Sequence, residues 1–220
     1  MNDKTSIVLS HPTKQVGGTV KLTGSKSESN RALIIQALSK GSVQVANLSE
    51  AADTVTMNKA VQLAETGGNS AEPTTIDIGP AGTAMRFLTS YLNLAKGTFK
   101  LTGSARMPER PIKLLVDALQ KLGANITYLG KDGYPPLQIE GPMSQKADSV
   151  SIPGDISSQY ISSLLLVAPA LEKGLSLHIE GELTSKPYVS MTLDMLRESG
   201  ISYEWNEQTI QIPSQNFGNA

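Results

Sequence analysis

Apolar and polar positions follow one plan that occurs three times along this chain. Each copy begins with a short stretch of alternating apolar residues, passes through a glycine-containing turn into an apolar helical segment, and ends with a glycine and another short apolar stretch. Because a period of two is typical of strands and a period of 3.6 of helices, each copy predicts strand, turn, helix and strand. The copies span residues 19–48, 74–103 and 149–181.

Glycines punctuate the three copies at matching points. The turn glycines are Gly24, Gly79 and Gly154, and the glycines expected to close the helices in a left-handed conformation are Gly41, Gly97 and Gly174. Each copy is followed by a second predicted helix, over residues 57–67, 111–123 and 187–200. In the middle one, an apolar stripe recurs at helical spacing, formed by Ile112, Leu115, Leu119 and Leu122.

Strands with a period of two follow the later helices, around residues 126–128, 137–139, 201–205 and 210–212. The whole pattern predicts one α/β domain of three βαβαββ units with pseudo-threefold symmetry. No unit can bury its apolar helix face alone, so we expect the helices to pack inward with the sheets around them. An ordinary doubly wound sheet is the alternative that the pattern leaves open.

Composition narrows the function classes. Residues of hydrophobic type make up 39% of the 220 residues, which is enough for a substantial core. The formal net charge is −1, so the overall charge does not indicate binding to nucleic acid or to an anionic membrane. The absence of cysteine excludes disulfides, thiolate metal sites and a cysteine nucleophile. With no long apolar segment, we expect a soluble intracellular protein.

The three strand-to-helix turns are rich in small polar residues, at places where a helix N-terminus leaves backbone N–H groups free to bind anions. The first turn, GSKSESNR, adds the cations Lys26 and Arg31, and it lacks the spacing of a nucleotide-binding P-loop. In the second, GPAGTAMR, Gly82 permits a close backbone approach and Thr83 can cap the helix. The third, GDISSQY, offers hydroxyl and amide groups.

Taken singly, each turn is explained equally well by ordinary helix capping. Equivalent turns of one pseudo-symmetric domain should converge at one end, however, and then face a common cleft. Further groups that could reach this cleft precede the second helices, namely Arg106, Arg110, Ser185, Lys186 and Tyr188. Arginine forks suit phosphate and carboxylate, so a small substrate with several negative charges is implied.

The two histidines do not indicate catalysis or metal binding. His11 lies in an irregular N-terminal stretch, and His178 alternates with apolar neighbours on a predicted strand and should face outward. The carboxylates are scattered without the spacing of metal ligands, so no metal site is predicted.

Five segments in this order, GSKSESNR, GPAGTAMR, RMPERPI, DISSQY and TSKPY, resemble the signature segments of the 5-enolpyruvylshikimate-3-phosphate synthase family. The resemblance extends from Val20 to about Ile212 and implies an inverted α/β prism of three repeated units. It further implies transfer of the enolpyruvyl group of phosphoenolpyruvate to the 5-hydroxyl of shikimate 3-phosphate. Phosphate is released, on the route to chorismate and aromatic amino acids, and no cofactor is needed.

The resemblance also implies the site residues. Those for shikimate 3-phosphate are Ser27, Arg31, Ser157, Ser158, Ser185 and Tyr188. Those for phosphoenolpyruvate are Gly82, Arg110 and Gln159. Lys26 would touch both substrates and act catalytically, because cations in a closed site can neutralise the charge of phosphate and carboxylate while the tetrahedral adduct forms.

Some positions depart from the pattern of bacterial members of the family. Phe87 stands where proline is common, Pro80 replaces a frequent asparagine, and Ala52 and Asp53 stand where an acidic pair is usual. The helix of Phe87 borders the expected phosphoenolpyruvate pocket, so this position bears on how tightly the competitor glyphosate would bind.

Family members are about twice as long as this chain, which implies a second lobe of similar size. We therefore expect residues 1–220 to form the N-terminal lobe, with residues 1–16 belonging to the interdomain region and the C-terminal lobe absent. That lobe carries the family's acid/base groups, so the chain alone should give no turnover. The resemblance further implies a cytoplasmic monomer whose partners are the two substrates and the missing lobe, with neither nucleic acid nor membrane.

Three other hypotheses remain open at this point. The sister enolpyruvyl transferase that acts on a UDP-linked amino sugar has the same prism, but its usual loop cysteine is absent here and its first turn lacks the pattern of residues 27–31. A non-catalytic module could sense a phosphorylated metabolite with the same lobe. A purely structural domain would leave the polar turns without a shared purpose.

Overall fold

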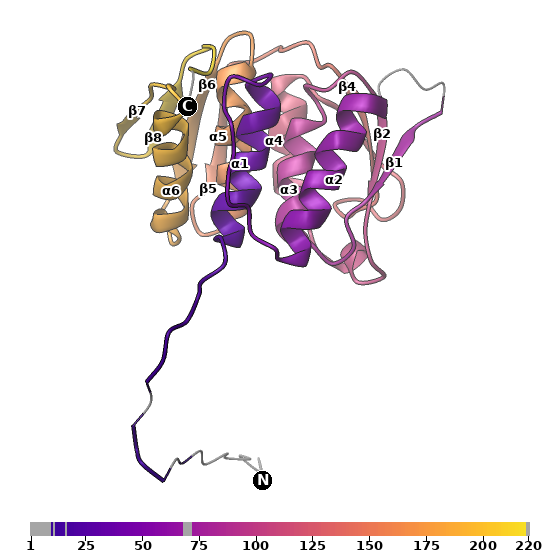
Figure 1. The fold of residues 1–220 in the computed structure, drawn as a ribbon. Helices are drawn as coiled ribbons and strands as arrows, with labels where there is room; N and C mark the ends of the chain where they lie inside the picture. The colour runs from indigo at the N-terminus through magenta and orange to yellow at the C-terminus, as the bar shows by residue number, and fades with distance from the viewer. Residues whose placement is uncertain (1–9, 11, 16, 68–71, 219–220) are drawn as a thin grey trace, which may run out of the picture.

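The repeat of the sequence is visible in the order of helices and strands. The computed structural model describes residues 10, 12–15, 17–67 and 72–218. Within them, two sheets flank a group of helices, as Figure 1 shows. His11 lies outside the described residues, and so does most of the segment 1–16 that we assign to an interdomain region.

The second and third units contain the predicted succession of elements. Unit two consists of β1 (Thr74–Asp77), α3 (Gly82–Tyr91), β2 (Gly97–Thr102), a 3₁₀ turn (Met107–Glu109), α4 (Lys113–Leu122), β3 (Asn125–Tyr128) and β4 (Leu137–Gly141). Unit three consists of β5 (Ser149–Pro153), α5 (Ser158–Val167), a 3₁₀ turn (Ala168–Ala170), β6 (Leu175–Glu180), α6 (Lys186–Glu198), β7 (Glu204–Asn206) and β8 (Thr209–Ile212).

The two units form sheets of identical topology. The strand orders are β1-β2-β4-β3 and β5-β6-β8-β7. In each sheet the first pair is parallel and the other pairs are antiparallel. Because the strands described form two separate mixed sheets, the doubly wound alternative is wrong, and the repeat is confirmed for these two units.

Unit one departs from the prediction. It contains α1 (Lys26–Leu38) and α2 (Ala52–Gly67), but the segments 19–24 and 43–48, expected as strands, are not paired. Only residues 68–73 separate α2 from β1, which is too short for the two extra strands that units two and three have at this point. A pair of strands without those neighbours is marginally stable, and Val20 and Leu22 are 80% and 86% exposed.

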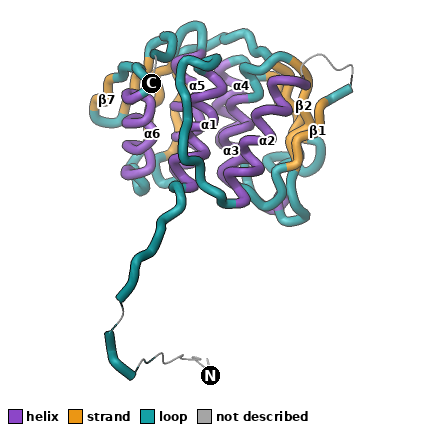
Figure 2. The backbone as a smooth tube through the Cα atoms, viewed as in Figure 1, coloured by secondary structure: helices purple, strands orange, loops and turns teal. Residues whose placement is uncertain are grey.

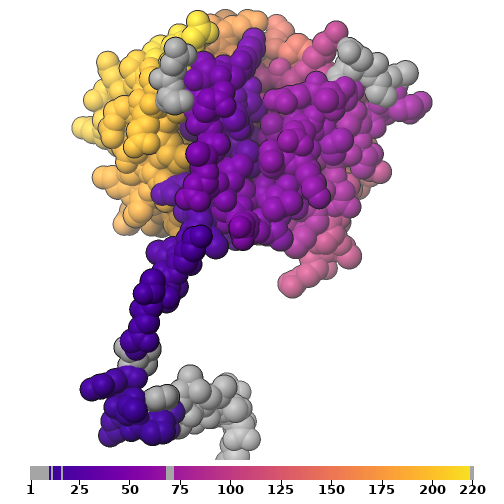
Figure 3. Space-filling view, viewed as in Figure 1, coloured from indigo at the N-terminus to yellow at the C-terminus, as the bar shows by residue number. Residues whose placement is uncertain are grey.

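The hydrophobic core lies around α3 and α5, which pack against each other. Every residue of α3 except Thr83 is buried, and every residue of α5 except Gln159. Figure 2 shows the helices in purple grouped between strands in orange, so helices do pack inside as predicted. On the side of unit one, α1 and α2 themselves form the surface (Figure 3).

Helix α4 illustrates how the sequence determines its own element. Its predicted apolar stripe from Ile112 to Leu122 is buried, and the helix ends at Gly123, whose φ is +115°. A side chain there would be strained in φ and would meet the carbonyl oxygen of Ser144. The glycines predicted to close the central helices also have positive φ, but they lie beyond the ends of those helices: Gly41 and Gly174 in the links that follow, and Gly97 as the first residue of β2.

Candidate functional site at the helix N-termini

The α-helices that the structure describes begin at the same end of the molecule, which we call the turn end (Figure 1). It contains the strand-to-helix turns 24–26, 79–82 and 154–158. Each turn lies against the link that precedes the second helix of its own unit. The contacts are Gly24 with the backbone of Asn47 and Ser49, the N–H of Ser104 donating to the Gly79 carbonyl at 2.9 Å, and the N–H of Thr184 donating to the Gly154 carbonyl at 3.2 Å.

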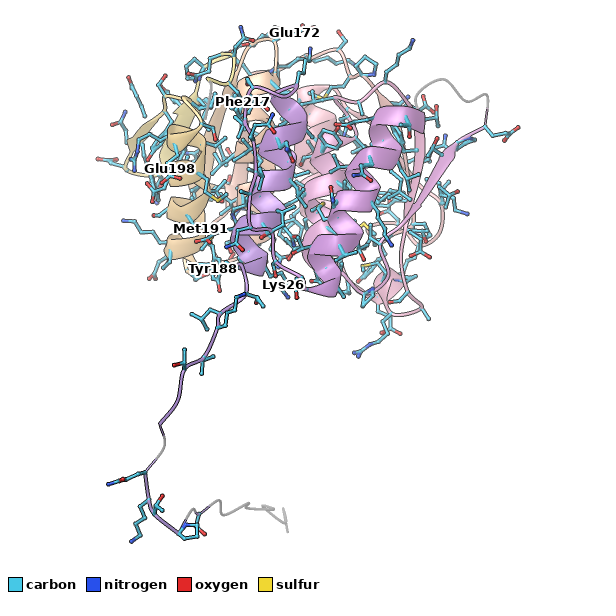
Figure 4. The ribbon with its side chains drawn as sticks, in the orientation of Figure 1. Lys26, Glu172, Tyr188, Met191, Glu198 and Phe217 are labelled. Atoms are coloured by element: carbon cyan, nitrogen blue, oxygen red, sulfur yellow. The ribbon has the colours of Figure 1, made fainter. Side chains whose placement is uncertain are left out.

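Lys26 lies at this end of the molecule together with Tyr188, whereas Glu172 and Phe217 lie at the opposite end (Figure 4). It is the first residue of α1, and its side chain is 51% exposed. Its ammonium is 3.4 Å from the carboxylate of Asp53, in the first turn of α2. Because such an exposed ion pair is weak, this cation remains accessible to an anion.

Arg31 is buried below the first turn and is only 3% exposed. Its Nε donates to Thr192 Oγ1 at 2.7 Å and one terminal nitrogen donates to the Ser27 carbonyl at 2.8 Å. The other terminal nitrogen donates to Ser162 Oγ at 3.1 Å and to the Tyr188 carbonyl at 3.4 Å. Burial lowers the pKa of Arg31 to about 10, with partial opposition from Tyr188 and Glu28, so it is charged at neutral pH.

Through these bonds, Arg31 joins the start of α1 to α5 and to the start of α6. Ser27 and Tyr188, both predicted to bind one substrate, are thereby brought to the same place. The side chain of Tyr188 is half exposed, while its carbonyl is held inside. The four hydrogen bonds of Arg31 all go to protein groups in this structure, so the geometry gives it an anchoring role beneath the turn.

Gly82 and Arg110, predicted to share one substrate, are in contact. A Cβ added to Gly82 would lie 2.5 Å from Cζ of Arg110, so the guanidinium occupies the space that any side chain at position 82 would need. Arg110 also donates to the Pro80 carbonyl at 3.3 Å and remains exposed. With Arg106 it lines a hollow of about 380 Å³. An exposed guanidinium on a helix N-terminus is a suitable anion-binding group.

The third turn places its polar groups at the start of α5. Ser157 caps the helix by accepting from the N–H of Gln159 at 3.4 Å, and Ser158 is buried while Gln159 is half-buried. Ser185 precedes α6 and makes no side-chain capping bond, and the bond from Thr184 to Gly154 holds its link against this turn. The predicted hydroxyl groups are therefore at the turn end as expected.

Arg86 is a residue to which the sequence analysis gave no role. It is 5% exposed and donates to the Gly82 carbonyl at 3.2 Å and to the Pro111 carbonyl at 2.9 Å. Its guanidinium lies 5.7 Å from the ring centroid of Tyr160. Burial lowers its pKa; Tyr160 opposes this shift and the charge of Arg110 adds to it. The signal in the sequence was its spacing, since Arg31 and Arg86 both lie seven residues after a turn glycine.

Lys186 and His178 both lie next to residues of the strands β7 and β8. The ammonium of Lys186 lies 5.3 Å from the ring centroid of Trp205, so this side chain contacts β7. His178 is exposed, as predicted, and its Nδ1 is 3.1 Å from Thr209 Oγ1. Within the described part of the chain, no group of three or more potential ligands could hold a metal ion, and no helix is long and apolar enough to cross a membrane.

The chain resembles known proteins over most of its length. A sequence model of the family described as EPSP synthase (3-phosphoshikimate 1-carboxyvinyltransferase) matches residues 10–217. A 3-phosphoshikimate 1-carboxyvinyltransferase of Bacteroides fragilis is 46% identical over 211 residues, which are 96% of this chain and 49% of the relative. One of Sulfurovum sp. is 44% identical over 208 residues, 86% of this chain and 48% of the relative.

The chain thus spans about half the length of the curated relatives it matches. Among solved structures, EPSP synthase from Acinetobacter baumannii superimposes with a TM-score of 0.76 at 24% identity, covering 91% of this chain and 49% of that one. At this identity the likeness concerns the fold, and it confirms the predicted α/β prism class.

Proposed function

The chain belongs to the EPSP synthase family, and from this premise we propose that it is the lobe that binds shikimate 3-phosphate and one side of phosphoenolpyruvate for enolpyruvyl transfer. The observation that carries the proposal is the gathering of the polar turns of all three units at one end of the molecule, where the α-helices begin. Such an end concentrates unpaired N–H groups and cations, which suits two substrates that both carry phosphate.

The acceptor half of the site would be formed by the first and third turns with the start of α6. These segments carry the hydroxyls proposed for shikimate 3-phosphate, on Ser27, Ser157, Ser158, Ser185 and Tyr188. Hydroxyl groups can donate to phosphate and can also accept from the hydroxyls of a ring, so one set of residues can bind both parts of that substrate. Arg31 supplies positive charge from below and orders the carbonyls of Ser27 and Tyr188.

The donor half would be formed by Gly82, Arg110 and Gln159. The contact between Gly82 and Arg110 supports this assignment, because it places a guanidinium against a helix N-terminus. Lys26 is proposed to touch both substrates and to neutralise charge as the tetrahedral adduct develops, an electrostatic task that preorganised cations perform well. The acid/base steps are assigned to the family's other lobe, so this chain alone should not release phosphate.

The proposal also covers the compartment and oligomeric state of the protein, and its binding of glyphosate. We propose a cytoplasmic monomer that works with a second lobe of the same family. Phe87, which differs from the common proline, is buried with its ring 5.4 Å from the guanidinium carbon of Arg31. It lies below the turn rather than on it, so we expect any effect on glyphosate binding to be indirect, through the packing of α3.

A calorimetric titration tests the proposal. The chain is titrated at fixed ionic strength with shikimate 3-phosphate, first alone and then with phosphoenolpyruvate present, because the contacts are largely charged. We expect the chain to bind shikimate 3-phosphate saturably. In Arg110→Ala this affinity should change by less than about twofold, but the addition of phosphoenolpyruvate should no longer alter it. Arg106→Ala, which lines the same hollow, is the matched control and should retain both responses.

The outcome that contradicts the proposal is equally concrete. If shikimate 3-phosphate does not bind, or if UDP-N-acetylglucosamine binds in its place, the assignment of the acceptor half is wrong. A phosphate-release assay on the same preparation tests the expected lack of turnover, and a rate near that of a complete enzyme would contradict it.

A further inference from the structure

We propose that Arg86 is the positioning residue of the donor half, the group that holds Gly82, Arg110 and Gln159 in one fixed arrangement. The inference rests on the proposed function in naming the donor substrate. It concerns a side chain that is 5% exposed and lies beneath the site, so Arg86 acts through other residues and not by contact with the substrate.

Two hydrogen bonds and one ring contact of Arg86 reach the three donor segments. One terminal nitrogen donates to the carbonyl of Gly82 itself at 3.2 Å. The other donates at 2.9 Å to the carbonyl of Pro111, the residue that follows Arg110. The guanidinium lies 5.7 Å from the ring centroid of Tyr160, the residue that follows Gln159. One side chain therefore contacts segments from α3, from the link before α4 and from α5.

The Pro111 carbonyl is the centre of this arrangement. It accepts from Arg86 at 2.9 Å and from the Tyr160 hydroxyl at 2.5 Å, so both of its lone pairs are used. A peptide held from two sides has little freedom to rotate, and the backbone that carries the adjacent Arg110 is fixed with it. The backbone of Arg86 is itself fixed, because Ser163 Oγ donates to its carbonyl at 2.6 Å.

Only arginine suits this position. Its planar fork presents donors in two directions while its face lies over an aromatic ring, and a lysine ammonium cannot do all three. Both acceptors of its terminal nitrogens are backbone carbonyls, so the positive charge is not neutralised by a carboxylate in these bonds. That charge is close enough to Arg110 for the two cations to disfavour each other, and an anion bound at Arg110 would relieve this.

The first arm of the test does not depend on any ligand. Amide hydrogen exchange is measured on the full chain and on Arg86→Gln, which keeps a polar side chain but loses the fork. We expect the amides of Arg110 and Ile112, bonded to the carbonyls of Met107 and Gly133, to exchange about tenfold faster. Amides of β6 and β8 in the other sheet should change by less than about twofold.

The second arm measures the substrates on the same proteins. With shikimate 3-phosphate saturating, phosphoenolpyruvate should bind about tenfold more weakly to Arg86→Gln, and shikimate 3-phosphate alone should change by less than about twofold. Arg31→Gln is the matched control, since it removes the equivalent buried arginine of unit one. It should weaken shikimate 3-phosphate and leave exchange at Arg110 unchanged.

A less disruptive variant tests the proposal if Arg86→Gln does not fold. Tyr160→Phe retains the ring under Arg86 and removes only the hydrogen bond to Pro111, so we expect effects in the same direction of about threefold. Uniform acceleration of exchange across the chain, or no change at Arg110 and Ile112, would overturn the role of Arg86. If the unmodified chain fails to bind phosphoenolpyruvate, the proposed donor half fails, while the exchange arm still decides the role of Arg86.

Discussion

The surroundings of Arg31 and of Arg86 are two versions of one arrangement. Both arginines lie seven residues after a turn glycine and donate to the carbonyl four residues earlier. Both also reach a carbonyl near the start of a second helix and lie over an aromatic ring. They differ in their remaining partners: Arg31 also donates to the hydroxyls of Ser162 and Thr192, whereas the two terminal nitrogens of Arg86 donate to the carbonyls of Gly82 and Pro111.

The difference bears on how each half of the site can respond to a ligand. A hydroxyl can rotate and exchange donor and acceptor roles, so the surroundings of Arg31 can rearrange without losing hydrogen bonds. Carbonyls are fixed by the backbone, so the hydrogen-bond partners of Arg86 have less freedom to rearrange. We infer that the acceptor half adapts to its substrate and that the donor half is preformed.

Unit three has no arginine in the equivalent place. Seven residues after Gly154 the chain has Ile161, which is fully buried in the hydrophobic core. Instead, α5 contributes two consecutive serines: Ser162 bonds to Arg31, and Ser163 bonds to the carbonyl of Arg86. The third unit therefore supplies hydrogen-bond partners to both buried arginines, Arg31 and Arg86, and has no such arginine of its own.

The largest effect is expected from forcing the third unit to resemble the other two. Ile161→Arg would bury a charge in a place that is apolar, and we expect it to lower the free energy of unfolding by more than about 4 kcal/mol, or to prevent folding. Ile161→Met is the control for size and should cost less than about 1.5 kcal/mol. Urea unfolding measures both.

If Ile161→Arg folded with nearly the stability of the parent chain, position 161 of unit three would accept a guanidinium. The difference between unit three and the other two would then not be a matter of packing.

A smaller effect separates the two arginines themselves. Arg31→Met removes four hydrogen bonds, two to hydroxyls and two to carbonyls, so we expect a loss of about 4 kcal/mol. Arg86→Met removes two bonds and should cost about 2 kcal/mol. Urea midpoints at unchanged m-value give the two costs. Equal costs would contradict the inference that the two centres differ in kind.

The adjacent serines sharpen the comparison further. Ser162→Ala should weaken binding of shikimate 3-phosphate, because the Ser162 hydroxyl accepts from Arg31. Ser163→Ala should weaken binding of phosphoenolpyruvate, because the Ser163 hydroxyl donates to the Arg86 carbonyl. Each variant should lower the free energy of unfolding by about 1 kcal/mol. Each variant is the other's control, since both hydroxyls are fully buried on one helix. Calorimetry measures the affinity of each variant for each substrate. If both variants lost affinity for the same substrate to the same extent, Arg31 and Arg86 would not act independently.

Much of the fold followed from the sequence because local pattern and tertiary packing agree. The stripe from Ile112 to Leu122 predicted α4, and the period-two segments predicted β3, β4 and β8. The strands of unit one could not be predicted in this way, because a strand requires partners. Within the described residues, the segments 19–24 and 43–48 have none.

For the site, the sequence identified residue types and spacing but not directions. Gly82 and Arg110 were assigned to one substrate, and they are in contact. Lys186 was one of the groups that could reach the cleft, and its ammonium lies 5.3 Å from the ring centroid of Trp205. Arg86 could have been suspected from its spacing, but only the folded chain specifies that its fork reaches the carbonyls of Gly82 and Pro111.

The smallest effect concerns the cation at the surface, in contrast with the two that are buried. Lys26 pairs with Asp53 at 3.4 Å across solvent-accessible side chains, so Asp53→Asn should change the free energy of unfolding by less than about 1 kcal/mol. High salt screens such pairs, and the difference should vanish at about 1 M salt. Urea unfolding at two ionic strengths measures it, with Asp194→Asn, which breaks the exposed pair to Arg197, as the control. A loss comparable to that of Arg86→Met would show that Lys26 is held as firmly as the buried arginines, and the distinction between an accessible cation and the anchoring ones would fail.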